Sequence, residues 1–337
     1  MMRRAVLVSL MVSVLLVACS SREASPPVRR KTGSPLREFD LAPGIGHMTT
    51  AFGSLWIVGS AEVLRIDPDT GKVIGSIPVP GLTAKGDGGA TDWSEIDGGG
   101  GSIWVTAEPD LVRIDPRTNE ISLRITDESG VSHIVFSRGA VVVGGSAEGN
   151  GDVRVLVPDT TEYLFQRPVG SLQGYPSILA TRDWYWGGGK SLAGGPALGR
   201  TSTDGSVSQV IAGVQRFDSF VEASGSVWVT GGNFLYRVDD EAGGSAPSPQ
   251  SVFPQEAHAV TATFQVDGPA IVASDGMGLW LLEQGRGVHV TELDPVTGDR
   301  IGPPILLEHE PPAEIAVVDG RPWISFRMSG TLVTLAR

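Results

Sequence analysis

Short stretches of alternating residues, separated by glycine turns, run along most of this chain. His47–Phe52 and Glu314–Val318 are two of them, and a turn glycine follows each. A second apolar run then carries an aromatic residue, as in Gly53–Val58. Alternation with a period of two, interrupted by turn glycines, predicts β-strands joined as hairpins.

The step from glycine to tryptophan recurs down the chain. It is clearest at Gly53–Val58, Gly101–Thr106 and Gly225–Thr230. Aligning every unit on this step gives seven anchor positions, 38 to 52 residues apart: Trp56, Trp104, Val142, Tyr185, Trp228, Trp280 and Trp323. A period in the forties with four strands per unit is typical of a β-propeller.

The clear units continue with a third strand and a sharp turn. We expect third strands at Val63–Ile66, Leu111–Ile114 and Leu235–Val238, and the first of these runs into Asp67-Pro-Asp-Thr-Gly71. Proline presets φ in such a turn and glycine can take a positive φ, so the chain reverses into a fourth strand. The segment Ala257–Pro269 fits this scheme poorly and is interpreted as an inserted strand or loop at the entry to unit six, with His258 in it.

The seventh unit stops at Arg337 without a fourth strand. Leu36–Gly44 has the character of a fourth strand and lies at the other end of the chain. Pairing the two ends would leave no free sheet edge at the junction. We therefore predict an all-β fold for residues 36–337: a seven-bladed β-propeller whose last blade is closed by the N-terminal strand.

The first 18 residues have the pattern of a secretion signal. Arg3 and Arg4 precede an apolar run, Ala5–Ala18, that is too short to span a bilayer comfortably. The tetrapeptide Leu16-Val-Ala-Cys19 resembles the bacterial lipobox, which implies cleavage before Cys19 and a lipid on its sulfur. An ordinary signal peptide with an incidental cysteine is the alternative.

Residues 19–35 are then the lipidated cysteine and a tether. Ser20–Pro35 is polar, contains prolines and shows no apolar periodicity, which is typical of a flexible linker. The membrane, reached through the lipid on Cys19, is thus the first predicted partner. The predicted location is the bacterial cell envelope, facing outside the cytoplasm.

Composition supports this picture and excludes some functions. Glycine and proline number 45 and 23, as suits a fold made of tight turns. The net charge is −12 and no basic stripe is present, so we expect no nucleic-acid partner. Cys19 is the single cysteine, which excludes an internal disulfide.

Gly53–Val58 followed by Val63–Ile74 resembles the repeats of secreted bacterial seven-bladed propellers, the YVTN type and the related virginiamycin B lyase-like group. The resemblance extends over about residues 36 to 337 and is strongest in units one, two, six and seven. The lyase group implies a metal held by histidines and an acid, with a Glu-x-His pair late in the chain. This chain has Glu308-His309-Glu310 and His289–Glu292, but no such pair at a matching unit.

Candidate site residues follow from the repeat itself. The first strand of a propeller blade lines the central channel, so the start of that strand faces the channel mouth. Counting six residues back from each turn glycine, or its equivalent at position 182, selects His47, Glu95, His133, Pro176, Ser219, Ala270 and Glu314. His47, Glu95, His133 and Glu314 come from neighbouring blades and would form an arc suited to a divalent cation or to proton transfer.

Other motifs give weaker evidence for a functional site. The tryptophans at repeat spacing are predicted to form the core between blades, whereas Trp93 and Trp184 lie outside that register. Gly187–Gly195 resembles a phosphate loop but lacks its spacing, so we interpret it as a flexible loop.

Two functions of different class remain open. The first is a lipid-anchored binding or scaffolding module for a protein, peptide or glycan partner. The second is a metal-assisted lyase or hydrolase that works at the arc of His47, Glu95, His133 and Glu314. No cofactor is certain, and a divalent metal is the candidate that the arc suggests.

Overall fold

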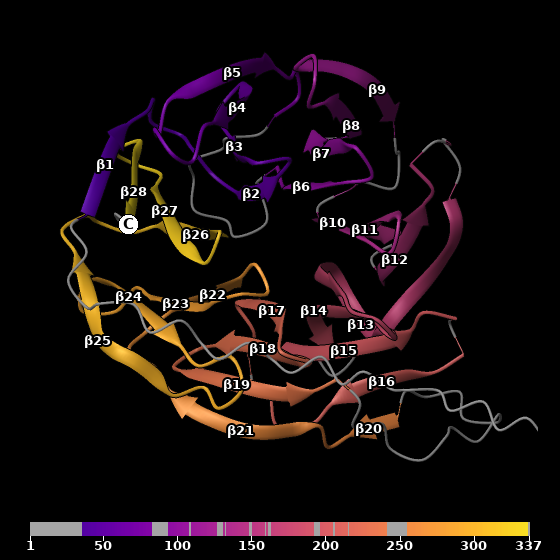
Figure 1. The fold of residues 1–337 in the computed structure, drawn as a ribbon. Helices are drawn as coiled ribbons and strands as arrows, with labels where there is room; N and C mark the ends of the chain where they lie inside the picture. The colour runs from indigo at the N-terminus through magenta and orange to yellow at the C-terminus, as the bar shows by residue number, and fades with distance from the viewer. Residues whose placement is uncertain are drawn as a thin grey trace, which may run out of the picture. The chain divides into compact units, whose positions relative to one another are not determined.

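The computed structural model describes residues 36–335, except 83–93, 108, 127–130, 132, 148–149, 159, 161–162, 192–195, 205, 215 and 241–254. Every regular element in these ranges is a β-strand, and the strands form seven blades in a ring (Figure 1). The predicted all-β, seven-bladed propeller is confirmed. Within the described ranges no helix is suited to cross a membrane. The predictions for residues 1–35 and for Trp93 lie outside the described residues.

Four blades follow the predicted order along the chain. Blade 1 contains β2 (Met48–Ala51), β3 (Ser54–Val58), β4 (Glu62–Ile66) and β5 (Val73–Pro78). Blade 2 contains β6 (Ile96–Gly99), β7 (Ser102–Ala107), β8 (Asp110–Asp115) and β9 (Glu120–Thr126). Blade 5 contains β17 (Ser219–Ala223), β18 (Ser226–Gly231), β19 (Phe234–Asp239) and β21 (Val260–Gln265). Blade 6 contains β22 (Ala270–Ser274), β23 (Leu279–Glu283), β24 (Val288–Leu293) and β25 (Arg300–Leu307).

Blade 7 joins the two ends of the chain. Its inner strands are β26 (Ala313–Val318), β27 (Arg321–Phe326) and β28 (Thr331–Leu335), and its outer strand is β1 (Leu36–Asp40). β1 runs antiparallel to β28, with Leu36 opposite Leu335 and Asp40 opposite Thr331. The predicted closure by the N-terminal strand is confirmed.

Blades 3 and 4 share one strand. Blade 3 begins with β10 (His133–Ser137), β11 (Ala140–Ala147) and β12 (Asn150–Leu156), and blade 4 contains β14 (Trp184–Ser191), β15 (Pro196–Ser202) and β16 (Ser208–Ile211). Between them β13 (Tyr163–Ala180) pairs with β12 through its first half and with β14 through its second. The two blades therefore form one continuous eight-stranded sheet with β20 (Gln255–Ala257) at its edge.

The segment Ala257–Pro269 differs from the sequence interpretation. β20 adds a parallel strand to β16 of blade 4, whereas β21 is the regular fourth strand of blade 5, paired with β19. His258 lies between these two strands and not at the entry to blade 6. The long connection after Asp240 displaced the fourth strand in the sequence, which made it look like an insertion.

Seven clusters of buried apolar side chains fill the seven spaces between neighbouring blades. Six clusters contain an almost fully buried tryptophan: Trp56, Trp104, Trp186, Trp228, Trp280 and Trp323. In the seventh, between blades 3 and 4, Val142 takes this place. The core role predicted for the repeat tryptophans is confirmed.

The structure of blade 4 corrects one of the predicted anchor positions. Tyr185 packs back against blade 3, and Trp186 packs forward against blade 5 as Trp56 packs against blade 2. The cause is the position of the turn: the Thr181 N–H donates to the Trp184 carbonyl at 2.9 Å, so two residues form the turn, as they do between Ala51 and Ser54. Asp183, and not residue 182, therefore corresponds to the turn glycine, and the anchor of this unit is Trp186.

The glycine-rich run that follows is also different from the prediction. Gly187–Ser191 belongs to β14, and its residues 187–190 pair with β15, so this part is a strand and not a loop. A Cβ on Gly188 would lie 2.3 Å from the ring of Phe217. Glycine is required there because the aromatic ring occupies the space that a side chain would take.

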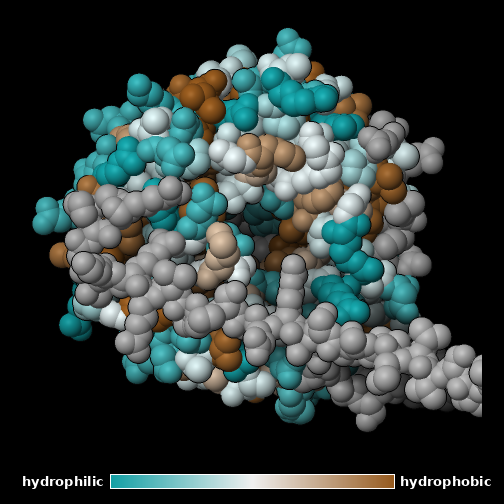
Figure 2. Space-filling view, viewed as in Figure 1, coloured by the Kyte–Doolittle hydropathy of each residue, from teal (hydrophilic) through white to brown (hydrophobic). Residues whose placement is uncertain are grey.

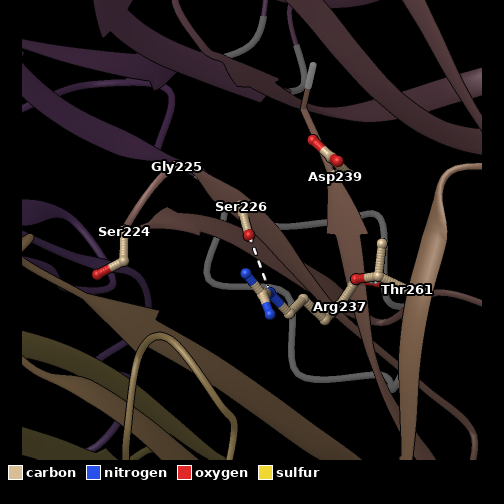
Figure 3. A pocket seen from close by; sticks show the side chains of 6 residues that line it. All are labelled: Ser224, Gly225, Ser226, Arg237, Asp239 and Thr261. Atoms are coloured by element: carbon tan, nitrogen blue, oxygen red, sulfur yellow. Dashed lines mark hydrogen bonds between the residues drawn. The ribbon is translucent and has the colours of Figure 1, made fainter. Parts of the chain in front are cut away.

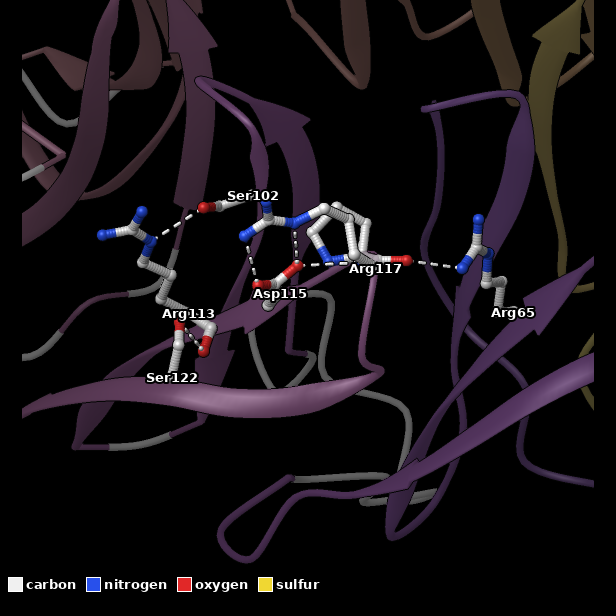
Figure 4. A network of polar contacts seen from close by, with 7 residues as sticks. Arg65, Ser102, Arg113, Asp115, Arg117 and Ser122 are labelled. Atoms are coloured by element: carbon white, nitrogen blue, oxygen red, sulfur yellow. Dashed lines mark hydrogen bonds and ion pairs between the residues drawn. The ribbon is translucent and has the colours of Figure 1, made fainter.

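An arginine on the third strand links blades in several units (Figure 4). Arg65 donates from Nε to Ser54 Oγ at 2.9 Å and from a terminal nitrogen to the Pro116 carbonyl of blade 2 at 2.6 Å. Its guanidinium also lies 5.0 Å from the Trp56 ring centre. Arg113 repeats the arrangement with Ser102, Trp104 and Pro158. In these two blades the serine after the turn glycine and the core tryptophan thus both position this arginine.

Deleting residues 36–44 should destabilise the ring. The deletion exposes the edge of β28 and removes Leu36 and Phe39, whose ring stacks on Trp323 at 5.7 Å between centres. Burial of each large apolar side chain contributes about 1.5–3 kcal/mol, so we expect a loss of at least about 3 kcal/mol in urea unfolding. Deleting residues 20–28 of the predicted tether is the control. Equal stability of both truncated proteins would contradict closure by β1.

Candidate functional site: the channel mouth

The first strands of the blades stand side by side around the centre of the ring, in the order β26, β2, β6, β10, β13, β17, β22. Figure 2 shows the face hollowed at this centre. His47 and Glu95 lie directly before β2 and β6, His133 begins β10, and Glu314 is the second residue of β26. Equivalent pairing places all four at one level, with His133 opposite Gly144 and Glu314 opposite Ser325.

Two other members of the predicted set shift by one residue. Ser177 pairs with Gly188 and takes the place expected for Pro176, because Asp183, and not residue 182, stands where the turn glycine stands in blade 1. In blade 6, Trp280 pairs with Ala273 as Trp56 pairs with Thr49, so Ile271 and not Ala270 occupies the equivalent position. Ser219 is placed as predicted, opposite Thr230.

Glu95 and His133 are in direct contact. Glu95 Oε1 lies 2.5 Å from His133 Nδ1, and Oε2 accepts the backbone N–H of Ile134 at 3.1 Å. Only 19% of the Glu95 side chain and 14% of the His133 side chain are exposed. The carboxylate of blade 2 therefore holds both the side chain and the backbone of the first strand of blade 3.

Asp97 makes a second connection of the same kind. Its carboxylate accepts the backbone N–H of Phe136 at 2.6 Å and the hydroxyl of Thr49, on blade 1, at 2.9 Å. Burial raises the pKa of Asp97, although these hydrogen bonds act against the rise. Asp97 thus connects blade 2 to both of its neighbours.

These carboxylates accept hydrogen bonds from backbone N–H groups that are left free at a sheet edge. β10 is the edge strand of its sheet, and residues two apart on such a strand direct their free N–H groups to the same side. Ile134 and Phe136 have this spacing, and Glu95 and Asp97 match it on the neighbouring blade. Ser219 Oγ does the same for the Val272 N–H, at 2.9 Å. Part of the acidic character of the mouth is therefore structural.

Opposing effects act on the pKa of Glu95. Burial raises this pKa, but the neighbouring His133 imidazole, His47 and the Ile134 N–H outweigh burial, so the pKa lies below its ordinary value of 4.5. Glu95 is therefore an ionised partner of two imidazoles at neutral pH. The structure brings His47, Glu95 and His133 into one electrostatic neighbourhood.

Glu314 has a different neighbour. It acts electrostatically on Arg327, whose pKa is lowered by burial, and the Glu314 charge partly offsets that effect. A cation beside Glu314 reduces its use as a metal ligand. Among the described residues, no group of three or more His, Cys, Asp or Glu side chains is arranged to hold a metal ion.

The chemistry of the mouth centres on His133. When Glu95 holds Nδ1 of the ring, the neutral imidazole presents its other nitrogen, Nε2, as an acceptor. A carboxylate in this position fixes the tautomer and orientation of the ring, as in carboxylate–histidine–metal sites. The pair can therefore accept a proton, donate a hydrogen bond or contribute one ligand to a metal.

Sequence reasoning missed Asp97 and Thr49. The signal was present as the spacing Glu95-x-Asp97, which puts both side chains on one face of a strand. The partners of that face are backbone N–H groups 39 residues away, and these follow only from the ring geometry.

Comparison with known proteins supports the fold and no narrower relationship. No family model matches the chain, and no curated protein matches it. A chain of a mitotic checkpoint complex is 12% identical with a TM-score of 0.68, covering 97% of this chain and 99% of its own length. A chain of Kuenenia stuttgartiensis hydrazine synthase is 14% identical with a TM-score of 0.66, covering 88% and 96%.

BamB from Moraxella catarrhalis is a third similar structure, at 11% identity and a TM-score of 0.53, covering 87% of this chain and 83% of its own. Identities this low establish a shared fold alone. The resemblance to the YVTN and virginiamycin B lyase-like groups stays a prediction.

Replacing Glu95 by Gln should reduce stability in a pH-dependent way. Loss of a buried charged hydrogen-bonding partner costs about 1–3 kcal/mol at pH 7. Because the folded protein lowers this pKa, the stabilisation is complete above about pH 4.5 and is lost as the pH falls through the folded value. We expect the difference from wild type in urea unfolding to shrink below that pH. Glu120→Gln, at an exposed position, is the control, and a constant difference down to pH 3 would contradict the role.

Proposed function

We propose that this protein is a lipid-anchored β-propeller of the bacterial cell envelope that binds or scaffolds a protein, peptide or glycan partner at its channel mouth. The observation that carries the proposal is that the carboxylates at the mouth are already engaged by neighbouring groups of the protein. Glu95 and Asp97 hold the backbone of blade 3, and Glu314 lies beside Arg327. A polar rim whose groups are fixed by the scaffold suits recognition of a partner.

The fold gives independent support. β-Propellers are generally used as binding or scaffolding modules, and one of the similar structures is a chain of a multiprotein complex. Among the described residues, connections between second and third strands lie on the face of the mouth, as residues 59–61 of blade 1 and 327–330 of blade 7 do. Met328, in the connection after β27, is 69% exposed. The predicted lipid on Cys19 would hold this surface near the membrane.

Photo-crosslinking in cells tests which face binds. A photoreactive residue at Met328, on the face of the mouth, should give discrete crosslinked species. The same residue at Arg117 should give none, because the turn after β8 lies on the opposite face and its side chain is 86% exposed. Crosslinks from Arg117 only would contradict binding at the mouth.

The Cys19→Ser variant is the matched control for the anchor. The ring is unchanged in this variant, so any loss reflects the lipid. We expect the variant to leave the membrane fraction and to lose the Met328 crosslinks. Membrane association that survives the change would contradict a lipid on Cys19.

A second function, metal-assisted lyase or hydrolase chemistry, is favoured by one observation. Glu95 orients His133 so that Nε2 is a competent ligand or base, and His47 lies close enough to influence Glu95. His47 and His133 would be the nitrogen ligands of a divalent cation, which would polarise a bound substrate.

Zinc titration separates the two functions. The enzyme function predicts stoichiometric heat on adding Zn²⁺ to the wild type and its loss in the protein carrying both His47→Ala and His133→Ala. Changing His258, which lies far along the chain between β20 and β21, to Ala is the control and should leave binding intact. Absence of heat with the wild type would contradict the metal version.

A further inference from the structure

An open pocket of about 320 Å³ lies on blade 5 (Figure 3). Six residues line it: Ser224, Gly225, Ser226, Arg237, Asp239 and Thr261. Its polar groups are three hydroxyls, one guanidinium and one carboxylate. The volume is at the lower end of the range for small-molecule sites, which runs from about 300 to 1,000 Å³.

The pocket contains the blade 5 copy of the arginine that elsewhere links blades. In blades 1, 2 and 4 this guanidinium is held on two further sides. It lies 5.0, 5.7 and 5.1 Å from the ring centre of its own tryptophan, which is Trp56, Trp104 or Trp186. It also donates to a backbone carbonyl of the next blade, that of Pro116, Pro158 or Asp240, at 2.6, 3.1 and 3.0 Å.

Arg237 has neither of these contacts among the described residues. Its Nε donates to Ser226 Oγ at 3.0 Å, as the equivalent arginines of blades 1 and 2 donate to a serine. Its tryptophan, Trp228, packs instead against Phe264, with 6.0 Å between ring centres. Gly298 of the blade 6 turn lies against both rings, where a Cβ would be 2.7 Å from either.

Aromatic packing has therefore replaced the arginine between blades 5 and 6. The Nε bond to Ser226 still fixes the orientation of the guanidinium, whose terminal nitrogens point into the open space beside Ser226 (Figure 3). A positioned guanidinium with free N–H groups in a pocket is a preorganised anion receptor, because little rotamer entropy remains to be lost on binding.

We propose that this pocket binds a carboxylate group through Arg237. The planar guanidinium fork matches a carboxylate through two parallel N–H···O bonds. The hydroxyl of Ser224, at the exposed rim, can donate to a remaining lone pair, whereas the Thr261 hydroxyl already donates to the Arg237 carbonyl at 3.2 Å. Asp239 in the same lining repels a doubly charged phosphate more strongly than a singly charged carboxylate, so the pocket favours the carboxylate.

The pocket is separate from the channel mouth. Ser224 and Gly225 form the turn at the end of β17, whereas Ser219, at its beginning, lies at the level of the mouth. The two sites are therefore on opposite faces of the ring. The carboxylate can come from a peptide, as a side chain or a chain terminus, or from a free organic acid.

Nuclear magnetic resonance on the full chain tests the proposal through the Arg237 Nε–H signal. The probes are sodium acetate, the blocked peptide acetyl-Gly-Glu-Gly-amide and its Gln isostere. We expect the Glu peptide to shift the signal and the Gln peptide to leave it unchanged. A shift with acetate of similar affinity identifies a free organic acid as sufficient, and a response to the peptide only identifies a peptide-borne carboxylate.

Variants separate recognition from folding. Arg237→Gln should weaken binding of the Glu peptide at least tenfold, measured by calorimetry, and Arg237→Lys should give an intermediate loss because the charge remains without the fork. Arg117→Gln, at an exposed turn of blade 2, is the matched control and should bind like the wild type.

Thr261→Glu keeps the proposal testable if Arg237 variants fold poorly. Thr261 is exposed at the rim, so a glutamate there would occupy the guanidinium within the chain and compete with the peptide. We expect this variant to lose peptide binding while retaining Arg237. No response of the wild type to either carboxylate probe, or equal binding by wild type and Arg237→Gln, would overturn the proposal.

Discussion

The ring depends on the packing of each blade against the next. A four-stranded sheet has two faces, and both must be covered for the fold to be stable. Each space between blades is filled by one buried cluster, and in six of the seven a tryptophan supplies the largest side chain. Truncation of a side chain of this size typically costs about 3–5 kcal/mol. Closure of the ring requires every pair of neighbouring blades to be held together, so weaker packing at one interface must be compensated there.

The weakest aromatic packing coincides with a change in topology. Between blades 3 and 4 the tryptophan position holds Val142, and here β13 runs through both blades as one strand. Backbone hydrogen bonds along a shared strand connect these blades where a large side chain does not. The two features compensate each other, since covalent and hydrogen-bonded continuity fixes the relative position of the sheets.

Much of the fold could be predicted from the sequence because its information is local and repeated. The turn glycines, the tryptophan step and the Asp-Pro turns identify strands in order, and the missing last strand at one end of the chain pointed to Leu36–Gly44 at the other. Errors arose where the reference residue of the turn was misplaced. In blades 4 and 6 the residue counted as the turn glycine lies one position before the equivalent of Gly53, so Tyr185 was taken for Trp186 and Ala270 for Ile271.

The candidate site was predictable in position and not in role. Counting from the turn glycines placed His47, Glu95, His133 and Glu314 at one level of the channel. The hydrogen bond from Ile134 N–H to Glu95 could not be predicted, because it depends on how two edge strands from different blades are spaced. A carboxylate at a channel mouth thus has two explanations, ligand binding and edge satisfaction, and only the ring geometry separates them.

The same reasoning explains how a repeated fold acquires a site. The arginine of the third strand contributes to packing in blades 1, 2 and 4. There its guanidinium lies against an indole ring and donates to a backbone carbonyl of the next blade. In blade 5, Phe264 takes over the packing and the guanidinium keeps its orienting serine. The ring remains closed there, because the aromatic contact provides the packing that the guanidinium provides in blades 1, 2 and 4. The guanidinium of blade 5 is no longer needed for packing, but the scaffold still orients it. This is the simplest way in which a repeated packing residue becomes an anion-binding group.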